Sequence, residues 1–460
     1  MRRNPLSVLV MLVATSLLAT QAGASNTALF ARIDATAQDW LAISGAPSVS
    51  IAVVQDGSLA YARAYGDAEL APARPATTST RYAIDSVSKE FTAAAVLMLV
   101  ERGKLSLDDP IGKYIPDLGP ASKPTLRQVL NHTSGIRDYW PQDFVFPAMQ
   151  RPTSISGLIA EWVRCPLDFK PGTDWQYSNT GYVVAGAIVE RVSGMGLFDF
   201  LQQHIFVPLR MERVTEDDTQ PLPPGDAVGH TRQGLGPTRR APKEAAGWLF
   251  GAAELAMTPS DLARWDISLI DRSLLKPASY EAELEPVTLK NGMKKDYGLG
   301  LDVEVVQGRM RIGHTGAGSG FLSSNRIWPP EKTAIIVFTN NDWADPDDLV
   351  DRIAFVVLAP DPVEARARAV FSQYQQGTLD RTLFTDNGNS LLTAGALADL
   401  KDSLGPLGPP VLIVLEHEGR RGGMITRVWK ILCHSQRLRA VERGYPDGKL
   451  EQFLVTQLNN

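Results

Sequence analysis

The spacing of apolar residues predicts a helix, a β-hairpin and a second helix within the first hundred residues. Residues 27–43 place apolar side chains at helical spacing, which is typical of an amphipathic helix. Residues 48–54 and 59–65 have the pattern of strands, and the Asp-Gly pair at 56–57 between them favours a tight hairpin turn. A further helical pattern starts near residue 86. The pattern does not alternate strand and helix regularly, so we expect an α+β fold.

The central part of the chain predicts helices joined by proline-bearing loops, and then a return to strands. Residues 219–238 are rich in proline and glycine and predict a long surface loop. The sequence Thr-Pro-Ser-Asp at 258–261 resembles a capping box and predicts the start of the next helix. The elements expected after residue 258 are a helix over 262–270, strands over 297–306, 310–313 and 334–339, and a helix over 347–358.

A change of pattern near residue 360 predicts a second domain. Residues 359–362 contain two prolines and read as a linker. The expected elements beyond it are helices over 363–375 and 394–403 and strands over 411–417, 424–431, 437–441 and 450–455. We therefore expect a large domain over residues 25–360 and an accessory α+β domain over residues 361–460.

Composition and charge narrow the class of protein. The chain has 460 residues, 44% of them hydrophobic and 21% charged, which is enough to bury a large core. The formal net charge is −5 and no long basic run occurs, so nucleic acid is not an expected partner. The two cysteines, Cys165 and Cys433, are expected to be unpaired buried thiols.

The N-terminus predicts export. Arg2 and Arg3 precede an apolar stretch over residues 6–18, and Ala-Gly-Ala at 22–24 fits a cleavage site. We interpret residues 1–24 as a signal peptide and the protein as periplasmic or secreted. An uncleaved anchor is the weaker alternative because the apolar run is short for a membrane span, so stable membrane insertion is not expected.

The candidate nucleophile is Ser86 in the sequence Ser-Val-Ser-Lys at 86–89. Such a motif is weak alone, because a serine at a helix start is more often a cap. If Ser86 begins the helix, however, Lys89 lies one turn further on the same face and its amine reaches the hydroxyl. An apolar surrounding favours the neutral amine, and the helix N-terminus favours a developing alkoxide, so both effects activate the serine.

Two further segments supply partners for this serine. Tyr177 and Asn179 offer a phenol that relays protons and an amide that donates and accepts hydrogen bonds, although an ordinary turn is the alternative. His314, Thr315 and Gly316 extend the strand over 310–313, although a glycine-rich strand end with a surface histidine is the alternative. The backbone N–H groups of Ser86 and Ala317 are the candidate oxyanion hole.

These motifs together resemble the serine β-lactamase and penicillin-binding protein superfamily, in its class C-like branch with DD-carboxypeptidases, D-aminopeptidases and esterases. The motifs S-x-x-K at 86–89, Y-x-N at 177–179 and [KH]-T-G at 314–316 occur in the family's order. The resemblance covers roughly residues 30–358, and the sequence Leu-Asn-His-Thr-Ser-Gly at 130–135 also looks like a family landmark. It implies an antiparallel sheet flanked by helices, with a helical lobe and the serine in the groove between them.

The resemblance also implies roles. Ser86 would be acylated, Lys89 and Tyr177 would share its proton, Asn179 would hold the substrate amide, and His314, Thr315 and Gly316 would bind the substrate. His314 stands where class C β-lactamases carry lysine, which weakens the case for efficient antibiotic hydrolysis. An imidazole titrates near neutrality, so we also expect His314 to bind a carboxylate more tightly when it is protonated.

The predicted function is an exported serine acyl-hydrolase that acts on a small-molecule or peptide amide or ester, with no cofactor and no metal. The substrate, whether a β-lactam, a D-amino-acid peptide or an ester, stays open. The alternatives are a penicillin-binding sensor or scaffold that is acylated without turnover, and a pseudoenzyme that binds through its C-terminal domain. That domain resembles a nuclear-transport-factor-like fold and is a candidate homo-oligomerisation module.

Overall fold

The structure is a computed structural model that describes residues 27–142, 144–306, 308–360 and 362–458. The predicted signal peptide, residues 1–24, lies outside the described residues. Contacts between Cα atoms divide the chain into two compact units. One unit spans Ala37–Val350, and the other joins the residues up to Thr36 with those from Asp351 onwards.

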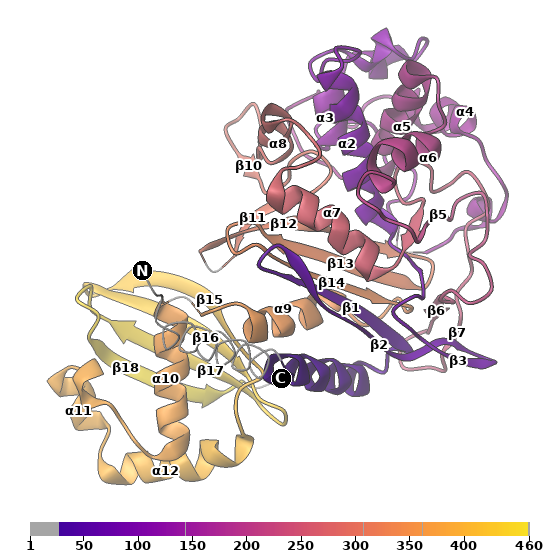
Figure 1. The fold of residues 1–460 in the computed structure, drawn as a ribbon. Helices are drawn as coiled ribbons and strands as arrows, with labels where there is room; N and C mark the ends of the chain where they lie inside the picture. The colour runs from indigo at the N-terminus through magenta and orange to yellow at the C-terminus, as the bar shows by residue number, and fades with distance from the viewer. Residues whose placement is uncertain (1–26, 143, 307, 361, 459–460) are drawn as a thin grey trace, which may run out of the picture. The chain divides into compact units, whose positions relative to one another are not determined.

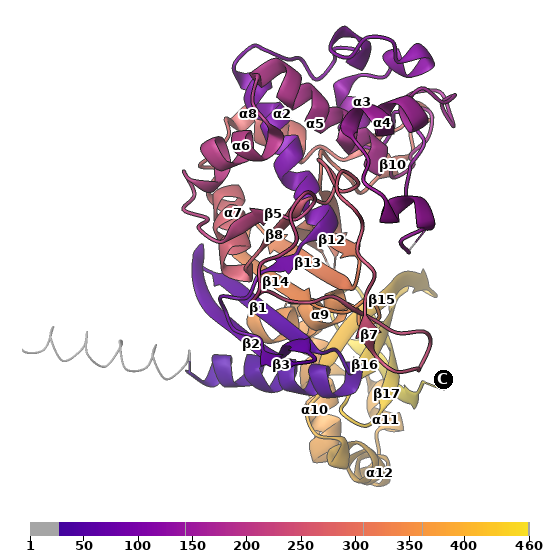
Figure 2. The ribbon, with the colours of Figure 1, turned by 90° about the vertical axis from the view of Figure 1, so that its right-hand side faces the viewer.

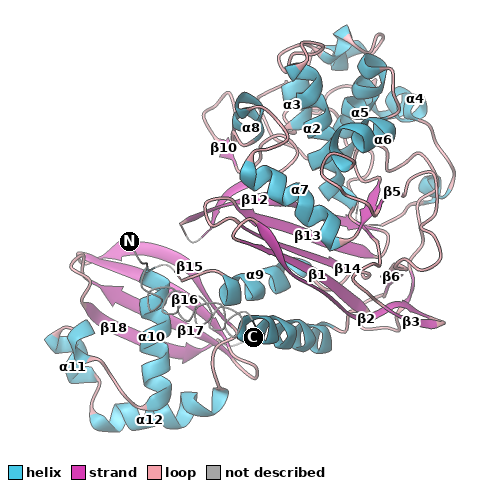
Figure 3. Cartoon of the chain, in the orientation of Figure 1, coloured by secondary structure: helices cyan, strands magenta, loops and turns pink. Residues whose placement is uncertain are grey.

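The larger unit is built on an antiparallel sheet of seven strands, which Figures 1 and 3 show beneath a group of helices. The spatial order is β11-β12-β13-β14-β1-β2-β3, so the N-terminal hairpin pairs with the last strand of the unit. The strands are β1 (Ser48–Gln55), β2 (Ser58–Leu70), β3 (Ala73–Pro75), β11 (Asp302–Val306), β12 (Arg309–Gly318), β13 (Phe321–Trp328) and β14 (Thr333–Thr339).

The predicted N-terminal helix and hairpin are confirmed. Residues 27–44 are helical, and β1 pairs with β2 across a two-residue turn. Asp56 and Gly57 have φ values of 49° and 73°. These left-handed values match the backbone twist that a two-residue hairpin requires, which explains the Asp-Gly pair.

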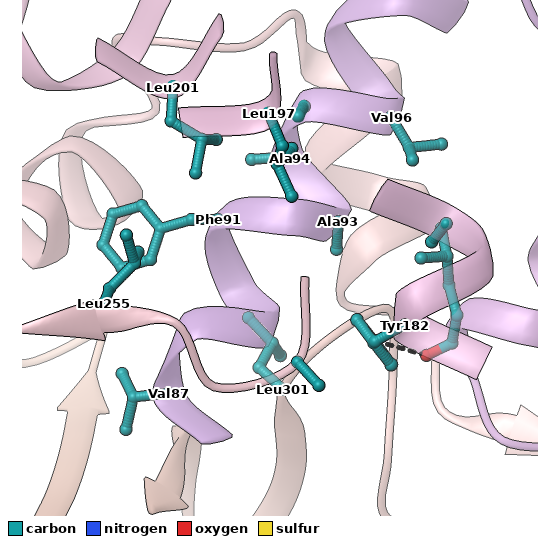
Figure 4. Packing of buried hydrophobic residues seen from close by; sticks show 14 of the residues in the cluster. Val87, Phe91, Ala93, Ala94, Val96, Tyr182, Leu197, Leu201, Leu255 and Leu301 are labelled. Carbon is teal, nitrogen blue, oxygen red and sulfur yellow. Dashed lines mark hydrogen bonds between the residues drawn. The ribbon is translucent and has the colours of Figure 1, made fainter. Parts of the chain in front are cut away.

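A helical lobe stands on one face of this sheet, as Figures 1 and 2 show. Its central helix, α2 (Ser88–Glu101), is buried over most of its length and packs against α5 (Asn179–Ser193). Phe91 and Ala94 lie among leucine, valine and aromatic side chains in the core shown in Figure 4. The other helices of the unit are α3 (Leu126–Leu130), α4 (Ile155–Leu158), α6 (Leu197–Leu201), α7 (Pro259–Asp271) and α8 (Pro277–Glu283).

Helix α7 begins as its sequence predicts. Thr258 is the N-cap, and its hydroxyl accepts a hydrogen bond from the Asp261 backbone N–H at 3.2 Å. Pro259 occupies the first turn, where it removes no helical hydrogen bond. The helix contacts β14, β1 and β2, so it covers the centre of the sheet.

Two features of the larger unit differ from the sequence prediction. Strand β13 has no predicted counterpart, because its central residues Ser323 to Arg326 are polar and nevertheless buried. The predicted strand over 297–306 begins only at Asp302, since Gly300 has a φ of +85° and interrupts extended backbone.

The predicted loop over 219–238 is irregular apart from β6 (His230–Thr231), which pairs with β7 (Arg239–Arg240). It is not wholly a surface loop, because Asp226 and His230 are buried. The His230 backbone N–H lies 3.2 Å from the carbonyl oxygens of both Gly320 and Asn340. The loop is thereby attached to the end of the sheet, beside β12 and β14. A smaller sheet orders β4 (Tyr82–Ala83), β8 (Leu255–Met257) and β5 (Val214–Glu216).

The smaller unit has its own sheet and core. Its four antiparallel strands are β15 (Leu412–Arg421), β16 (Met424–Leu432), β17 (Arg437–Gly444) and β18 (Leu450–Gln457). Its helices are α10 (Pro362–Gln376), α11 (Asp386–Leu391) and α12 (Ala394–Leu404), and α9 (Pro346–Val357) crosses the boundary between the units. Phe371, Trp429 and Phe453 belong to a separate core cluster. The resemblance to a nuclear-transport-factor-like fold stays a prediction, as does the domain boundary at residue 361.

The structure bears on the predictions about the two cysteines and about membrane insertion. Both cysteines are free, but only Cys433 is buried, so the expectation of a buried Cys165 is wrong. Within the described residues, no helix is both long enough and apolar enough to cross a bilayer.

Candidate active site

Ser86 lies on a short 3₁₀ turn, Asp85–Val87, immediately before α2. The helix proper therefore starts at Ser88 rather than at Ser86. Two glycines of β12 allow this turn to approach the sheet: a Cβ at Gly316 would lie 2.1 Å from the Ile84 carbonyl oxygen, and one at Gly318 would lie 2.0 Å from Asp85 Oδ1. The glycines after His314 thus have a steric reason, which is the close contact between β12 and the serine-bearing turn.

Lys89 reaches Ser86 as the sequence predicts. Its Nζ lies 3.0 Å from Ser86 Oγ, 2.8 Å from Asn179 Oδ1 and 2.9 Å from the Ala252 carbonyl oxygen. The side chain is fully buried. Burial lowers the pKa of Lys89 from 10.5 to about 7, and the carboxyl groups of Asp138 and Asp85 oppose this only in part. A large fraction of this lysine is therefore neutral at physiological pH.

Asn179 connects Lys89 to a buried carboxyl group. Its side-chain N–H donates to Asp138 Oδ2 at 3.2 Å, and its backbone N–H donates to Asp138 Oδ1 at 3.0 Å. These two bonds orient the amide so that its oxygen faces Lys89. Ser178 caps α5 by accepting from the Gly181 N–H, which places Asn179 at the first helical position.

Tyr177 is held against Lys89 and His132. Lys89 Nζ lies 4.9 Å from the centre of the Tyr177 ring, and the His132 ring centre lies 4.3 Å away on a tilted plane. The hydroxyl oxygen is buried and makes no hydrogen bond within the described residues. Burial raises the pKa of Tyr177 well above its usual value, although the nearby Ser86 hydroxyl lowers it in part. Tyr177 is therefore a neutral phenol with a proton to donate.

His132 belongs to the landmark at 130–135 and is structural. It is buried, and its Nδ1 accepts a hydrogen bond at 3.1 Å from the Ser178 backbone N–H. Burial lowers the pKa of His132 well below its usual value. The neutral ring thus supports the backbone next to Tyr177.

His314 lies on β12 but is neither exposed nor ionised. Its Nε2 lies 3.1 Å from the Tyr297 hydroxyl, and its Nδ1 lies 2.5 Å from the Thr315 carbonyl oxygen. Because a carbonyl only accepts, Nδ1 carries the proton and Nε2 accepts from Tyr297. Burial lowers the pKa of His314 to about 4. The expectation of a titration near neutrality is therefore wrong, and the imidazole is neutral throughout the usual assay range.

A cavity of about 1130 Å³ opens in front of these residues. It is lined by Ser86, Tyr177 and Asn179 from the helical lobe and by His314, Thr315 and Ala317 from β12. Gly316 is buried and lies close to the Ile84 backbone. The structure therefore brings all of the motif residues predicted from the sequence together at one cavity, although they are separated by up to 230 positions in numbering.

Several residues of this site carry no sequence signal. Asp138 orients Asn179, and Tyr297 orients His314. The Ala252 carbonyl oxygen lies within hydrogen-bond distance of the Lys89 amine. Each contacts its partner across 17 to 163 positions. No local pattern marks such contacts. Among the described residues, no group of three or more histidine, cysteine, aspartate or glutamate side chains is placed to hold a metal ion.

The fold and the motif arrangement define the class of serine hydrolases to which β-lactamases and penicillin-binding proteins belong. A family model described as Beta-lactamase matches residues 33–358. The chain belongs to the Beta-lactamase family, and the expected superfamily is confirmed. The expected fold of its large domain and its class as a serine hydrolase are confirmed as well.

Curated relatives are penicillin-binding and peptidase proteins. The chain is 28% identical over 310 residues to penicillin-binding protein 4* of Bacillus subtilis, covering 64% of this chain and 68% of that protein. It is 28% identical over 334 residues to a D-aminopeptidase of Brucella ovis, covering 70% of this chain and 62% of that protein. The match thus spans less than two thirds of the D-aminopeptidase.

A solved structure resembles more of the chain. The octameric penicillin-binding protein homologue from Pyrococcus abyssi has a TM-score of 0.64 and 20% identity, covering 94% of this chain and 96% of that one. At 20% sequence identity, this similarity is evidence about the fold alone. Its coverage extends beyond the segment matched by the family model.

Proposed function

We propose that the protein is an exported hydrolase that cleaves an amide or ester through an acyl-enzyme on Ser86. The observation that carries this proposal is the set of three atoms around Lys89 Nζ. Two of them, Asn179 Oδ1 and the Ala252 carbonyl oxygen, only accept hydrogen bonds. A neutral amine has two N–H groups for these acceptors and one lone pair, which is then directed at the Ser86 hydroxyl. The same contacts that bury the lysine therefore orient it as a base.

The proton path follows from the ionisation of the two groups. Ser86 Oγ attacks the carbonyl carbon while its proton moves to the neutral Lys89 amine, and the carbonyl π electrons move to the oxygen. The N–H groups of Ser86 and Ala317 are the proposed donors to this oxyanion. Collapse of the tetrahedral intermediate expels the leaving group, which takes a proton from Tyr177. Lys89 then reprotonates Tyr177. Water repeats the sequence to release the acid.

The names of the relatives support an amide substrate. Their names point to penicillin binding and to removal of D-amino acids, so a D-configured peptide or a β-lactam is the substrate class we propose. His314 and Thr315 line the same cavity and are proposed to position the substrate. Because the imidazole is neutral, its contribution is a hydrogen-bonded wall rather than a charge.

The test is covalent labelling of the full chain. A fluorophosphonate should modify the peptide that contains Ser86, and Ser86→Ala should abolish the adduct. Ser88→Ala is the matched control, because this neighbouring serine is buried and its hydroxyl accepts from the Leu255 N–H instead. Unchanged labelling of the Ser86→Ala variant would overturn the assignment.

A measurement of turnover distinguishes a hydrolase from a penicillin-binding sensor that is acylated without turnover. Nitrocefin, 4-nitrophenyl acetate and a D-Ala-D-Ala peptide should be tested at catalytic protein concentrations. Multiple turnovers that depend on Ser86 support the hydrolase. One acylation per chain without further product would instead identify a penicillin-binding sensor.

A further inference from the structure

Arg232 presents an unpaired guanidinium to the proposed active-site cavity. It follows β6 and lines the same cavity as Ser86 and Tyr177. Among the described residues that line this cavity, it is the one arginine or lysine. Its Nε is buried without a hydrogen-bond partner, and no ion pair or hydrogen bond links the described part of the chain to its guanidinium. A guanidinium has five N–H donors and no acceptor, so its unmet requirement is for an anion or a carbonyl oxygen.

The guanidinium is held in place by an aromatic platform. Its central carbon lies 4.5 Å from the centre of the Trp343 ring. The Trp343 indole N–H donates to the Ser44 carbonyl at 3.2 Å, and its backbone N–H donates to Asn341 Oδ1 at 2.9 Å. Stacking on an anchored ring restricts the arginine side chain before a ligand arrives, which lowers the entropy lost on binding.

Tyr177 lies beside the middle of β12, whereas the segment that carries Arg232 is attached just beyond the C-terminal end of this strand. The Tyr177 ring centre lies 6.0 Å from that of His314, near the start of the cavity-lining part of β12. The Arg232 segment is attached beyond Gly318, where the His230 N–H lies 3.2 Å from the carbonyl oxygens of Gly320 and Asn340. The serine-bearing turn packs against Gly316 and Gly318, between these two places. Residues 314 to 318 of a strand span about 13 Å, so the two places receive different parts of a bound substrate.

The proposed proton path decides which part of the substrate meets Arg232. The leaving group must lie near Tyr177, because it takes its proton from the phenol. The acyl part, which stays on Ser86, then extends the other way along β12. We infer that Arg232 binds a carboxylate carried by the acyl part of the substrate, so that the preferred substrates are acidic on the side that is retained in the acyl-enzyme. This inference rests on the proposed function.

The charge near Arg232 is compatible with an anion. Asp342 also lines the cavity, but its side chain is exposed and it forms no ion pair with Arg232. Asp138 lies at the Asn179 end and is engaged there. A carboxylate that binds Arg232 would therefore displace no existing ion pair, and the bidentate geometry of the guanidinium suits it.

Two matched fluorophosphonates test this inference. Both lose fluoride as Ser86 Oγ bonds to phosphorus, so their tails occupy the acyl side and no leaving-group substituent contributes. One tail ends in a carboxylate and the other in the isosteric carboxamide, and a series of methylene spacers covers the unknown length. The measurement is the second-order rate constant for labelling of Ser86 in the full chain.

We expect the carboxylate probe of best length to react at least about tenfold faster than its amide at low ionic strength. The ratio should fall as salt is raised from about 20 to about 500 mM, because screening weakens a partly exposed pair. Arg232→Gln should bring the ratio close to one, and Arg232→Lys should restore part of it. Arg239→Gln is the matched control, because this exposed arginine of β7 does not line the cavity, and it should keep the wild-type ratio.

The outcomes separate the two proposals. If neither probe labels Ser86, the proposed function fails. If both probes label Ser86 but the ratio is near one at every spacer length, or is the same in Arg232→Gln, the inference about Arg232 is wrong while the acyl-enzyme proposal stands.

Discussion

Replacing Lys89 by methionine removes an amine whose burial opposes its ionisation, so the variant should differ from wild type in the pH dependence of stability. The pKa of Lys89 is about 7 in the folded chain and 10.5 in the unfolded reference. Between these values the unfolded chain holds more protons on this group than the folded chain. The contribution of Lys89 to the free energy of unfolding therefore rises with pH across that window and is flat below it.

The magnitude follows from linkage. Each pH unit in this window is worth about 1.4 kcal/mol, so wild type should gain about 3 kcal/mol relative to Lys89→Met between pH 6.5 and about pH 9.5. The variant also leaves Asn179 Oδ1 and the Ala252 carbonyl without a donor, at a cost of about 1–3 kcal/mol each. That cost does not depend on pH, and all other titrating groups are shared. The difference between the two pH values therefore reports on Lys89 together with its coupling to Asp85 and Asp138.

Hydrogen exchange of peptides from α2 across a urea series measures this stability within the larger unit. Lys113→Met is the matched control. Lys113 is exposed, and its hydrogen bond to Asp109 raises the pKa, so its titration lies above the tested range and its variant should show a flat difference. An equal Lys89→Met difference at both pH values would refute the depressed pKa, and with it the argument that Lys89 is the base.

Further predictions concern activity. The profile of kcat/KM should have an acidic limb near pH 7, because activity appears as Lys89 loses its proton, and Lys89→Ala should remove the limb and lower turnover by about a hundredfold or more. Asp138→Asn should move that limb to lower pH, because the Asp138 carboxylate raises the pKa of Lys89 and the amide does not; an unmoved limb would contradict the coupling. Tyr177→Phe should also reduce turnover about a hundredfold without adding to the loss from Lys89→Ala, and additive effects would argue for separate proton paths. His314→Gln should leave the profile from pH 5 to 8 unchanged, because the imidazole is already neutral there; a lost limb would show that His314 titrates in this range. Deleting residues 361–460 should leave Ser86 reactive toward a fluorophosphonate, and a folded but unreactive truncated chain would show that the segment contributes to the site.

The local sequence pattern was sufficient to predict secondary-structure elements and contacts between residues close together in the chain. The hairpin turn at Asp56 and Gly57 and the cap at Thr258 follow from backbone chemistry within a few residues. The spacing of Ser86 and Lys89 likewise determines that they meet, because residues three apart share a face of a helix or of the 3₁₀ turn that precedes it. Such features depend on neighbours in the chain, so sequence alone predicts them.

Strand β13 was not predicted from the sequence, because its stability depends on contacts with residues far away in the chain. Donor groups of its buried polar side chains find distant partners: Ser323 donates to the Ile84 carbonyl, Asn325 to Asp266, and Arg326 to Asp302 and Asp347. Burying these polar groups without hydrogen-bond partners would cost free energy, so a run of polar residues normally predicts an exposed segment. The strand is stable because residues far away in sequence compensate the polarity.

The ionisation states of Lys89, Tyr177 and His314 also depend on the tertiary structure, because distant residues determine how deeply each group is buried. The sequence shows which groups are present at 89, 177 and 314, and the order of their motifs indicated the family. It does not show how much water each group keeps. Burial favours the neutral form of every one of them, which makes Lys89 a base near neutrality, keeps Tyr177 protonated and removes the charge expected on His314. Residue identity is a property of the chain, whereas desolvation is a property of the packed structure around it.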